Sequence, residues 1–294
     1  MRSKDFEQLP IRSFAGKDRK GEVELFSIEK LMAPQVDGKA HIEAHRHDYY
    51  HIMYIKNGIG AHTIDFKQYE IKPQSLFFVS PSQVHSLTVS TDVDGYVVTF
   101  TPEFYALDST LQRLLDYPFF HSMNNEPVVY LSHDFAPLQQ LVNDMLTEYN
   151  AAQKGANTVL RALLEVFLVR IARVYSSKER EDQPSHLSFQ LRKLESLIDI
   201  HFKEIKKLND YAELMHISPK HLNTLCKTGL NKTVTNLIHE RTLLEAKRLL
   251  LFTDNSVTEI AFDLGFSDKS YFMRFFKKQV GITAESYRMQ EDLP

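Results

Sequence analysis

The spacing of apolar and polar residues divides this chain into a first part that favours strands and a second part that favours helices. In residues 20–130, short aromatic and β-branched runs are separated by proline, Asn-Gly and Asp-Gly steps, which is typical of strands joined by turns. From residue 136 onward, apolar residues instead recur every three or four positions, which is the period of an amphipathic helix. We therefore expect a sandwich or small barrel followed by helices.

The runs in the first part predict several short strands. They lie at 49–55, 59–66, 70–71, 76–79, 85–89 and 96–100. Asn57-Gly58, between the first two runs, is a strong signal for a tight turn, so we expect these two runs to return on each other as a hairpin.

The end of the chain predicts a helix, a sharp turn and a second helix over residues 256–288. Ser256 and Glu259 have the spacing of a capping box, in which each side chain satisfies a backbone N–H at the helix start. Gly265 follows where a left-handed turn would end the first helix. Phe272 and Phe276, four positions apart, are expected to anchor the second helix in the core.

A second copy of this plan lies upstream, at 208–231. Ser218 is a suitable N-cap, Pro219 suits the first helical position, and Gly229 is expected to end the helix. Between the copies, residues 235–251 carry apolar side chains at helical spacing. A helix of about 17 residues spans about 25 Å. It would hold the second helix of each motif, here called the reading helix, at a spacing near one turn of DNA, about 34 Å.

The two motifs favour binding of double-stranded DNA, with one chain touching two successive major grooves. A single helix–Gly–helix unit is as readily an ordinary helical hairpin with a solvated basic side, but two units joined by a linking helix favour DNA binding. Charge adds little: from residue 186 onward there are 16 basic and 14 acidic residues, against 19 and 24 before it. The asymmetry has the expected sign and is small.

The cysteine content and the hydropathy of the chain favour a cytoplasmic location. Cys226 is the only cysteine, which excludes an internal disulfide and a cysteine-based zinc site. The N-terminal segment lacks the apolar core of a signal peptide, and no apolar run approaches the roughly 18 residues of a membrane helix. We therefore expect a cytoplasmic protein without a membrane span.

Residues from about 190 to 290 resemble the AraC/XylS family of bacterial transcription regulators. The segments that carry the resemblance are EIAFDLGFSDKSYFMRFFKKQVGITAESYR at 259–288 and RTLLEAKRLL at 241–250. The sequence departs at Cys226, where the family usually has a large aromatic residue, so the first reading helix is expected to pack more loosely. The resemblance implies a transcription regulator, with activation as the commoner mode.

The resemblance also implies roles for residues on the two reading helices. The positions that match base-contacting positions of the family are Lys220, Asn223, Thr224, Lys269, Ser270 and Arg274. Arginine and lysine can pair with guanine, and asparagine with adenine. The lysines better placed for phosphate, which positions the protein without specifying a sequence, are Lys227, Lys232, Lys277 and Lys278. The alternative for each lysine is an ordinary solvated side chain.

The first part of the chain resembles the cupin barrel, which AraC-type regulators carry as a sensory domain. The residues that match the two cupin motifs are His45, His47, His51 and Gly58 in the first and Pro73, Ser75, Pro81 and His85 in the second. The sequence departs from the pattern in two places, because His51 holds the usual acidic position and Ser75 the usual glycine.

The mouth of such a barrel is a common place for a small ligand. The residues predicted to line an effector pocket are His45, His47, Tyr49, His51, Tyr54, Phe78 and His85. Four histidines, His45, His47, His51 and His85, also have the chemistry to hold a transition metal. We favour structural or pocket histidines, and so no cofactor, because the regulator branch often retains such histidines without metal.

Two helices are expected at 136–153 and 157–175, broken near Lys154-Gly155. The second carries a wide apolar stripe, and in the family this helix pair commonly dimerises. The residues predicted to form a homodimer contact are Leu160, Leu163, Leu164, Phe167 and Ile171. The alternative is that the stripe only covers the barrel.

The sequence thus predicts a multi-domain chain with a cupin-like β-barrel and an all-α domain that holds two helix-turn-helix motifs joined by a long helix. The predicted limits are 1–135 for the ligand-sensing barrel, 136–176 for the helical pair, 177–188 for a linker and 189–294 for the DNA-binding domain. The predicted function is transcription regulation, as an activator that responds to a small-molecule effector and has RNA polymerase as a further partner. Two alternatives stay open: a metal-dependent cupin enzyme with an appended helical domain, and a ligand-independent architectural DNA binder. We expect no enzyme activity, because no nucleophile, base and orienting group stand in a recognisable pattern.

Overall fold

A computed structural model describes residues 11–12, 25–31, 35–36, 39–105, 114, 117–120, 126–131, 136–179 and 185–289. The chain divides into two compact units, one formed by Pro10–Glu181 and one that contains Asp182–Pro294. Residues 180–184 of the predicted linker lie outside the described residues. The finer domain limits stay predictions.

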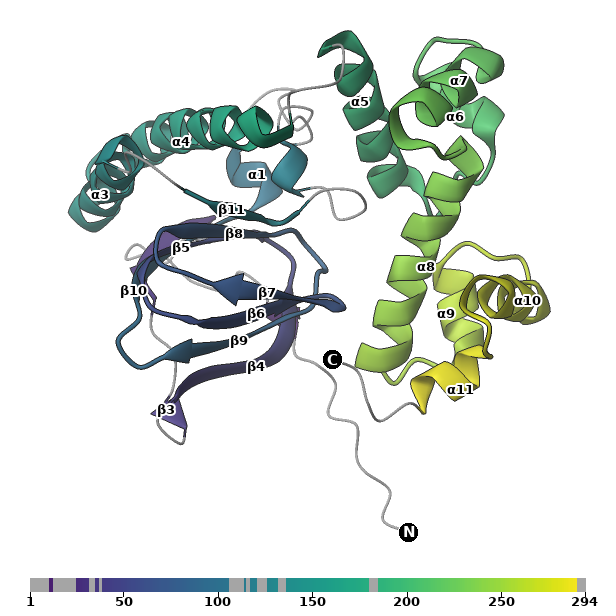
Figure 1. Ribbon diagram of the computed structural model, residues 1–294, viewed down its shortest axis with the longest axis horizontal. Helices are drawn as coiled ribbons and strands as arrows, with labels where there is room; N and C mark the ends of the chain where they lie inside the picture. The colour runs from purple at the N-terminus through teal and green to yellow at the C-terminus, as the bar shows by residue number, and fades with distance from the viewer. Residues whose placement is uncertain are drawn as a thin grey trace. The chain divides into compact units, whose positions relative to one another are not determined.

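The first unit is built on two β-sheets that face each other (Figure 1). The first sheet has the order β1 (Ile11–Arg12), β4 (Lys39–His47), β9 (His85–Ser90), β6 (Gly60–Ile64) and β7 (Lys67–Ile71), with β3 (Gln35–Val36) also paired to β4. The second has the order β11 (Val128–Tyr130), β8 (Ser75–Val79), β5 (Tyr50–Asn57), β10 (Asp94–Phe100) and β2 (Phe26–Lys30). The predicted cupin-like barrel is therefore confirmed.

The hairpin predicted at Asn57-Gly58 is wrong. Strand β5 pairs with β8 and β10, whereas β6 pairs with β7 and β9, so the turn carries the chain from one sheet to the other. Gly58 has a φ of +118°, and a Cβ on Gly60 would lie 2.1 Å from the carbonyl oxygen of Thr88. The glycines therefore serve a close crossover between sheets, which a local turn signal does not distinguish from a hairpin.

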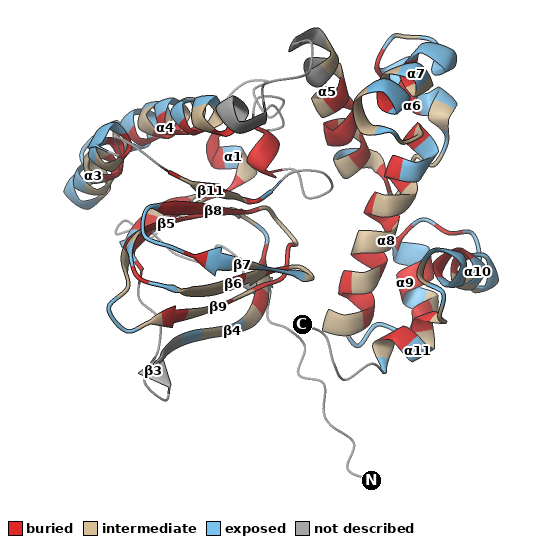
Figure 2. Cartoon of the chain, viewed as in Figure 1, coloured by how far each residue is buried: buried red, intermediate tan, exposed pale blue. Residues whose placement is uncertain are grey.

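The second sheet is buried on both faces because the barrel interior covers one face and helices cover the other. Alternate residues of the central strands β5 and β8 divide between two clusters: Met53 and Phe77 point into the barrel interior, whereas Tyr54 and Phe78 pack toward the helices. The covering elements are α1 (Pro102–Tyr105), η1 (Pro118–Phe120), α3 (Ala136–Ala151) and α4 (Ala156–Glu179). Figure 2 shows the long buried strips on this sheet and on the inner sides of α3 and α4.

Most of the predicted dimer contact is buried within the chain's own core. Leu160, Leu164, Phe167 and Ile171 are each 2% exposed or less, and they pack on the second sheet. Leu163 is half-buried against the same cluster. The stripe covers the barrel because its side chains complete the outer layer of the second sheet, so these four residues do not offer a surface to a second copy.

The second unit is all helical. Its helices are α5 (Ser185–His201), α6 (Leu208–Leu214), α7 (Pro219–Leu230), α8 (Val234–Phe252), α9 (Val257–Asp263), α10 (Lys269–Val280) and α11 (Ala284–Arg288). Within this unit, α8 runs as a rod with α6 and α7 packed near its start and α9, α10 and α11 near its end (Figure 1). The 19 residues of α8 give it a length of about 28 Å.

Most of the helix ends follow the predicted caps. Ser218 accepts from the backbone of His221 and Pro219 begins α7, while Ser256 and Glu259 form the complete capping box of α9. Gly265 and Gly281 have φ values of +77° and +89° and lie at the ends of α9 and α10. Gly229, however, lies inside α7, because the left-handed residue that ends this helix is Asn231. Asparagine tolerates this conformation well enough to move the helix end by two residues.

None of the helices in the described part of the chain is both long and apolar enough to cross a membrane.

Candidate nucleic-acid interface and histidine cluster

The two predicted reading helices differ from their neighbours in charge. Neither α7 nor α10 contains an aspartate or glutamate, whereas every other described α-helix contains at least one. Their outward faces instead carry basic and polar side chains, which are Lys220, His221, Thr224, Lys227 and Thr228 on α7 and Ser270, Tyr271, Arg274, Lys277, Lys278 and Gln279 on α10. Two helices without negative charge suit a surface that approaches a phosphate backbone.

The apolar sides of both helices hold these faces outward. Leu222 and Cys226 of α7 are at most 1% exposed, and Phe272 and Phe276 of α10 are fully buried. Burial raises the pKa of Cys226 to about 12, so the thiol stays neutral and packs as a small apolar group. The buried phenylalanines confirm the predicted anchors of α10.

Four of the six predicted base-contacting residues are exposed: Lys220, Thr224, Ser270 and Arg274. Asn223 is half-buried, and its Oδ1 accepts from the backbone N–H of Val234 at 3.1 Å. It thereby ties α7 to the first turn of α8. Lys269 is half-buried, and its Nζ lies 3.6 Å from Glu285 of α11.

The four lysines predicted to contact phosphate also divide into exposed side chains and one that is held in an ion pair. Lys227, Lys277 and Lys278 are exposed on the outer faces of α7 and α10. Lys232 instead forms an ion pair with Glu240 of α8 at 2.9 Å. Sequence position alone did not reveal this pairing, because the partner lies eight residues away across a turn between two helices.

Exposed side chains on the reading helices that the sequence interpretation missed include His221 and Tyr271. His221 is exposed one position after Lys220. Tyr271 is 52% exposed, and its ring lies 5.5 Å from that of Phe266. The signal was available in the helical period, because Tyr271 is one position before the buried Phe272 and therefore leaves the core face.

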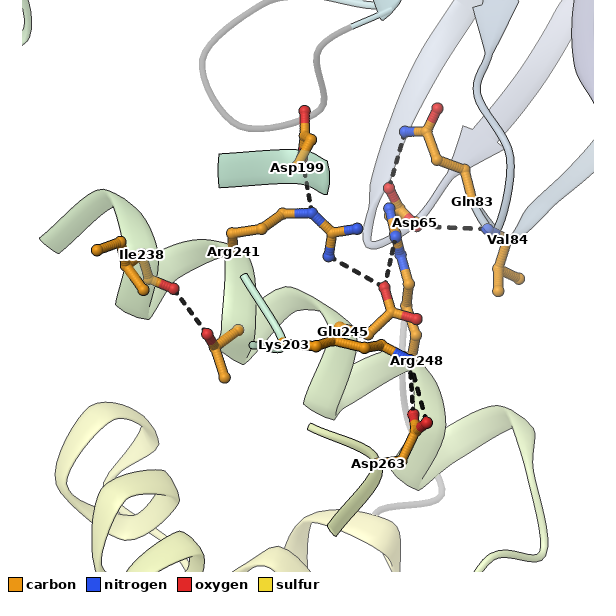
Figure 3. A network of polar contacts seen from close by, with 11 residues as sticks. Asp65, Gln83, Val84, Asp199, Lys203, Ile238, Arg241, Glu245, Arg248 and Asp263 are labelled. Atoms are coloured by element: carbon orange, nitrogen blue, oxygen red, sulfur yellow. Dashed lines mark hydrogen bonds and ion pairs between the residues drawn. The ribbon is translucent and has the colours of Figure 1, made fainter. Parts of the chain in front are cut away.

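A charged network stiffens the rod that separates the two reading helices (Figure 3). Glu245 Oε2 accepts from Arg241 Nη1 and from Arg248 Nη1, each at 3.0 Å, and Arg241 Nε donates to Asp199 of α5 at 2.7 Å. Burial alone would raise the pKa of Glu245, but the two guanidinium groups hold it below its ordinary value. The network therefore joins α8 to α5 through the Arg241–Asp199 pair, while Glu245 and Arg248 within it are almost fully removed from water.

The turn of the second motif is held against the segment that follows α5. Lys203 pairs with Asp263 at 3.0 Å (Figure 3), and Lys206 Nζ donates to the carbonyl oxygen of Leu264 at 2.8 Å. Burial lowers the pKa of Lys206 to about 8. A Cβ on Gly265 would lie 1.9 Å from the carbonyl oxygen of Lys203, so this close approach requires glycine.

Histidines from four strands meet inside the barrel. His45, His47 and His85 are at most 4% exposed, and one nitrogen atom from each lies within 4.8 Å of the others. His51 Nδ1 lies 3.3 Å from His47 Nε2. His62, which the sequence interpretation missed, is fully buried with its Nε2 3.0 Å from His85 Nδ1.

The structure does not bring all of the predicted effector residues together. Tyr49 stacks on His47 with ring centroids 4.3 Å apart, so it accompanies the histidines. Tyr54 and Phe78 pack on the outer cluster under the helices and are therefore not brought to the histidines. Burial, with the neighbouring histidines, lowers the pKa of His62 to about 3 and holds the pKa of His85 well below its ordinary value. These two imidazoles are neutral at physiological pH.

Two family models match the chain: the AraC-like ligand binding domain over residues 35–168 and a helix-turn-helix domain over residues 211–290. The HTH-type transcriptional activator RhaS of Escherichia fergusonii is 22% identical over 249 residues, which cover 84% of this chain and 88% of RhaS. The activator RhaR of Cronobacter sakazakii is 22% identical over 255 residues, with 84% and 86% covered. Among solved structures, the C-terminal domain of the response regulator AraT from Geobacillus stearothermophilus is 31% identical and covers 35% of this chain and 87% of that domain, with a TM-score of 0.34.

Proposed function

The chain belongs to the AraC family of transcription regulators, and on this premise we propose that it activates transcription by reading DNA with α7 and α10 under the control of an effector in its barrel. The similar proteins RhaS and RhaR are activators, which supports this direction. An activator of this kind has RNA polymerase as a partner. We infer a regulator rather than an enzyme because both matched family models describe parts of a regulator.

The main observation behind the proposal is that two helices without aspartate or glutamate, α7 and α10, belong to motifs joined by one long helix, α8. Helices α7 and α10 present basic faces, and the motifs that hold them are joined by α8, which is about 28 Å long. Successive major grooves on one face of B-DNA are about 34 Å apart. One chain can then place both helices on one face of the duplex.

Base reading falls to the exposed residues near the start of each reading helix. We assign it to Lys220 and Thr224 on α7 and to Ser270 and Arg274 on α10, since these side chains are exposed. Arg274 has the strongest role, because a guanidinium can donate two hydrogen bonds to one guanine. The Asn223 Oδ1 is engaged at the start of α8, so we propose that Asn223 positions α7.

Phosphate contact falls to Lys227, Lys277 and Lys278, which are exposed beyond the base-reading positions. Lys232 and Lys269 are engaged with Glu240 and Glu285, so their contribution to phosphate or base contact is smaller.

The test compares two variants of one helix, Arg274→Ala and Lys277→Ala, on a selected binding site and on the same site with single base changes. Arg274→Ala is expected to cost about 1–3 kcal/mol on the preferred site and to erase discrimination at one base pair. Lys277→Ala is expected to weaken all sites equally and to reduce the salt dependence by about one counterion. Equal weakening by Arg274→Ala across all sites would remove its base-reading role.

The effector site is proposed for the histidine cluster inside the barrel. His45, His47, Tyr49, His51 and His85 come together there, and polar side chains that meet in a mostly apolar interior are what a small-ligand site needs. An effector acts only if it binds one conformation more tightly than another. A compound that raises the melting temperature of the full chain and changes its DNA affinity would satisfy both requirements.

Homodimerisation is proposed through the outer face of α4. Val159 and Val166 are 44% and 42% exposed and lie two turns apart on one side of this helix, with the half-buried Leu163 between them. This face replaces the buried stripe as the dimer surface. A cytoplasmic location is proposed from the single, buried cysteine and from the function in transcription.

A further inference from the structure

Thr224 lies at the centre of the outward face of α7. It is two positions after the buried Leu222 and two positions before the buried Cys226, so at about 100° per residue it lies on the opposite side of the helix from both. Arg274 has the corresponding place on α10, midway between two buried phenylalanines. Thr224 therefore holds, on the first reading helix, the position that the proposed function gives to the strongest base-reading residue of the second.

The hydroxyl group of Thr224 is turned back onto its own helix. Its Oγ1 donates to the carbonyl oxygen of Lys220, one turn earlier, at 2.9 Å. A hydroxyl group has one hydrogen to donate, so Thr224 keeps no donor for the acceptor atoms of guanine or thymine. The side chain can still offer a base its Cγ2 methyl group and the lone pairs of Oγ1.

The neighbours of Thr224 on α7 leave room for an apolar contact with a base. Asparagine reads adenine with both atoms of its amide, but the Asn223 Oδ1 already accepts from the backbone N–H of Val234 at 3.1 Å. Lys220 is exposed one turn earlier on the same face, and its ammonium group only donates. A methyl contact at Thr224 would therefore add a kind of base recognition that these two side chains do not supply.

We propose that Thr224 reads a thymine by contact between its Cγ2 methyl group and the C5 methyl group of the base. Among the four bases, thymine presents a methyl group in the major groove, and a threonine methyl can pack against it. The inference rests on the proposed function, because it needs the first turns of α7 to lie against base edges. Helix α7 then recognises thymine by an apolar contact, whereas Arg274 of α10 recognises guanine by hydrogen bonds.

The test replaces single thymines by deoxyuridine, which removes the C5 methyl group and keeps the base pair with adenine. The duplex is one that the full chain enriches from random double-stranded DNA, and each of its thymines is replaced in turn. Replacement of one thymine is expected to weaken binding of the wild type about fourfold, as for loss of one buried methylene-sized group. Thr224→Ser keeps the hydroxyl group and loses the methyl group, so it should bind the thymine and deoxyuridine duplexes equally. Thr224→Val keeps a methyl group and should keep the difference.

The matched control is Thr228→Ser, which removes a methyl group from an exposed threonine one turn further along α7. It should keep the fourfold difference, because the N-terminal residues of a reading helix contact the base edges. The inference is overturned if the chain binds its duplex but no thymine is sensitive to deoxyuridine, if the difference survives in Thr224→Ser, or if it is lost in Thr228→Ser instead. Failure of the wild type to enrich any DNA would overturn the proposed function, and this inference with it.

Discussion

The buried carboxylate of Glu245 provides a direct test of how the rod between the reading helices is held. The substitution Glu245→Gln keeps the shape of the side chain and removes its charge. The side chains of Glu245, Arg241 and Arg248 are 8%, 10% and 2% exposed, so the loss leaves guanidinium groups with little access to water. Removing one partner of a buried ion pair costs about 3–5 kcal/mol. Arg241 keeps its pair with Asp199, so the expected loss lies at the lower end, about 3 kcal/mol.

The assay is urea unfolding of the helical unit within the full chain, followed by circular dichroism at a helical wavelength. With a slope of about 1–3 kcal/mol per molar urea, the midpoint should fall by at least about 1 M. The matched control is Glu240→Gln on the same helix, since the Lys232–Glu240 pair is 33% and 41% exposed and such a pair contributes about 0–1 kcal/mol.

A double variant separates charge from shape. Adding Arg248→Met to Glu245→Gln removes one of the two guanidinium groups that lose the Glu245 carboxylate, and it should recover at least half of the lost stability. The reasoning fails if Glu245→Gln costs no more than Glu240→Gln, or if the double variant is no more stable than Glu245→Gln alone.

Three further predictions concern other parts of the chain. Gly265→Ala should lower the free energy of unfolding by about 2–4 kcal/mol, because the added Cβ would lie 1.9 Å from the Lys203 carbonyl oxygen and the residue has a positive φ. An unchanged melting temperature would contradict this prediction. Burial of the charged Lys206 ammonium destabilises the folded state. This free-energy cost is complete below pH 8 and is relieved as the pH rises from about 8 toward 10, so the stability of the wild type relative to Lys206→Met should increase between pH 7.5 and 9.5. A constant difference in stability would refute the low pKa of Lys206. Val166→Asp should weaken the dimer at least tenfold in analytical ultracentrifugation, about 1.4 kcal/mol, and unchanged association would exclude the outer face of α4.

The helical unit was largely predictable from the sequence because its signals are local. Caps at Ser218 and Ser256, the turn at Gly265 and the buried anchors Phe272 and Phe276 each depend on a few neighbouring residues. The exceptions involve partners that are distant along the chain. Asn223 reads as a base-contacting residue on a helix face, yet its Oδ1 accepts from the first turn of the next helix.

The barrel was less predictable because its second sheet is buried on both faces. All five residues of β8 are buried, so no alternation of polar and apolar residues shows which side chains face the interior. Phe78 was for this reason grouped with the histidines, although it packs under the helices. His62 was missed because its role depends on the pairing of β6 with β9, which brings it to His85.

Reading of two successive major grooves by α7 and α10 of one chain underlies the proposed function. Selection of binding sites from random double-stranded DNA by the full chain tests this most directly, with Lys220→Ala and Arg274→Ala selected in parallel. We expect two preferred sequence blocks whose centres lie about 10–10.5 base pairs apart, with each variant degrading a different block. Enrichment of a single block, no enrichment at all, or equal loss of both blocks in each variant would contradict it.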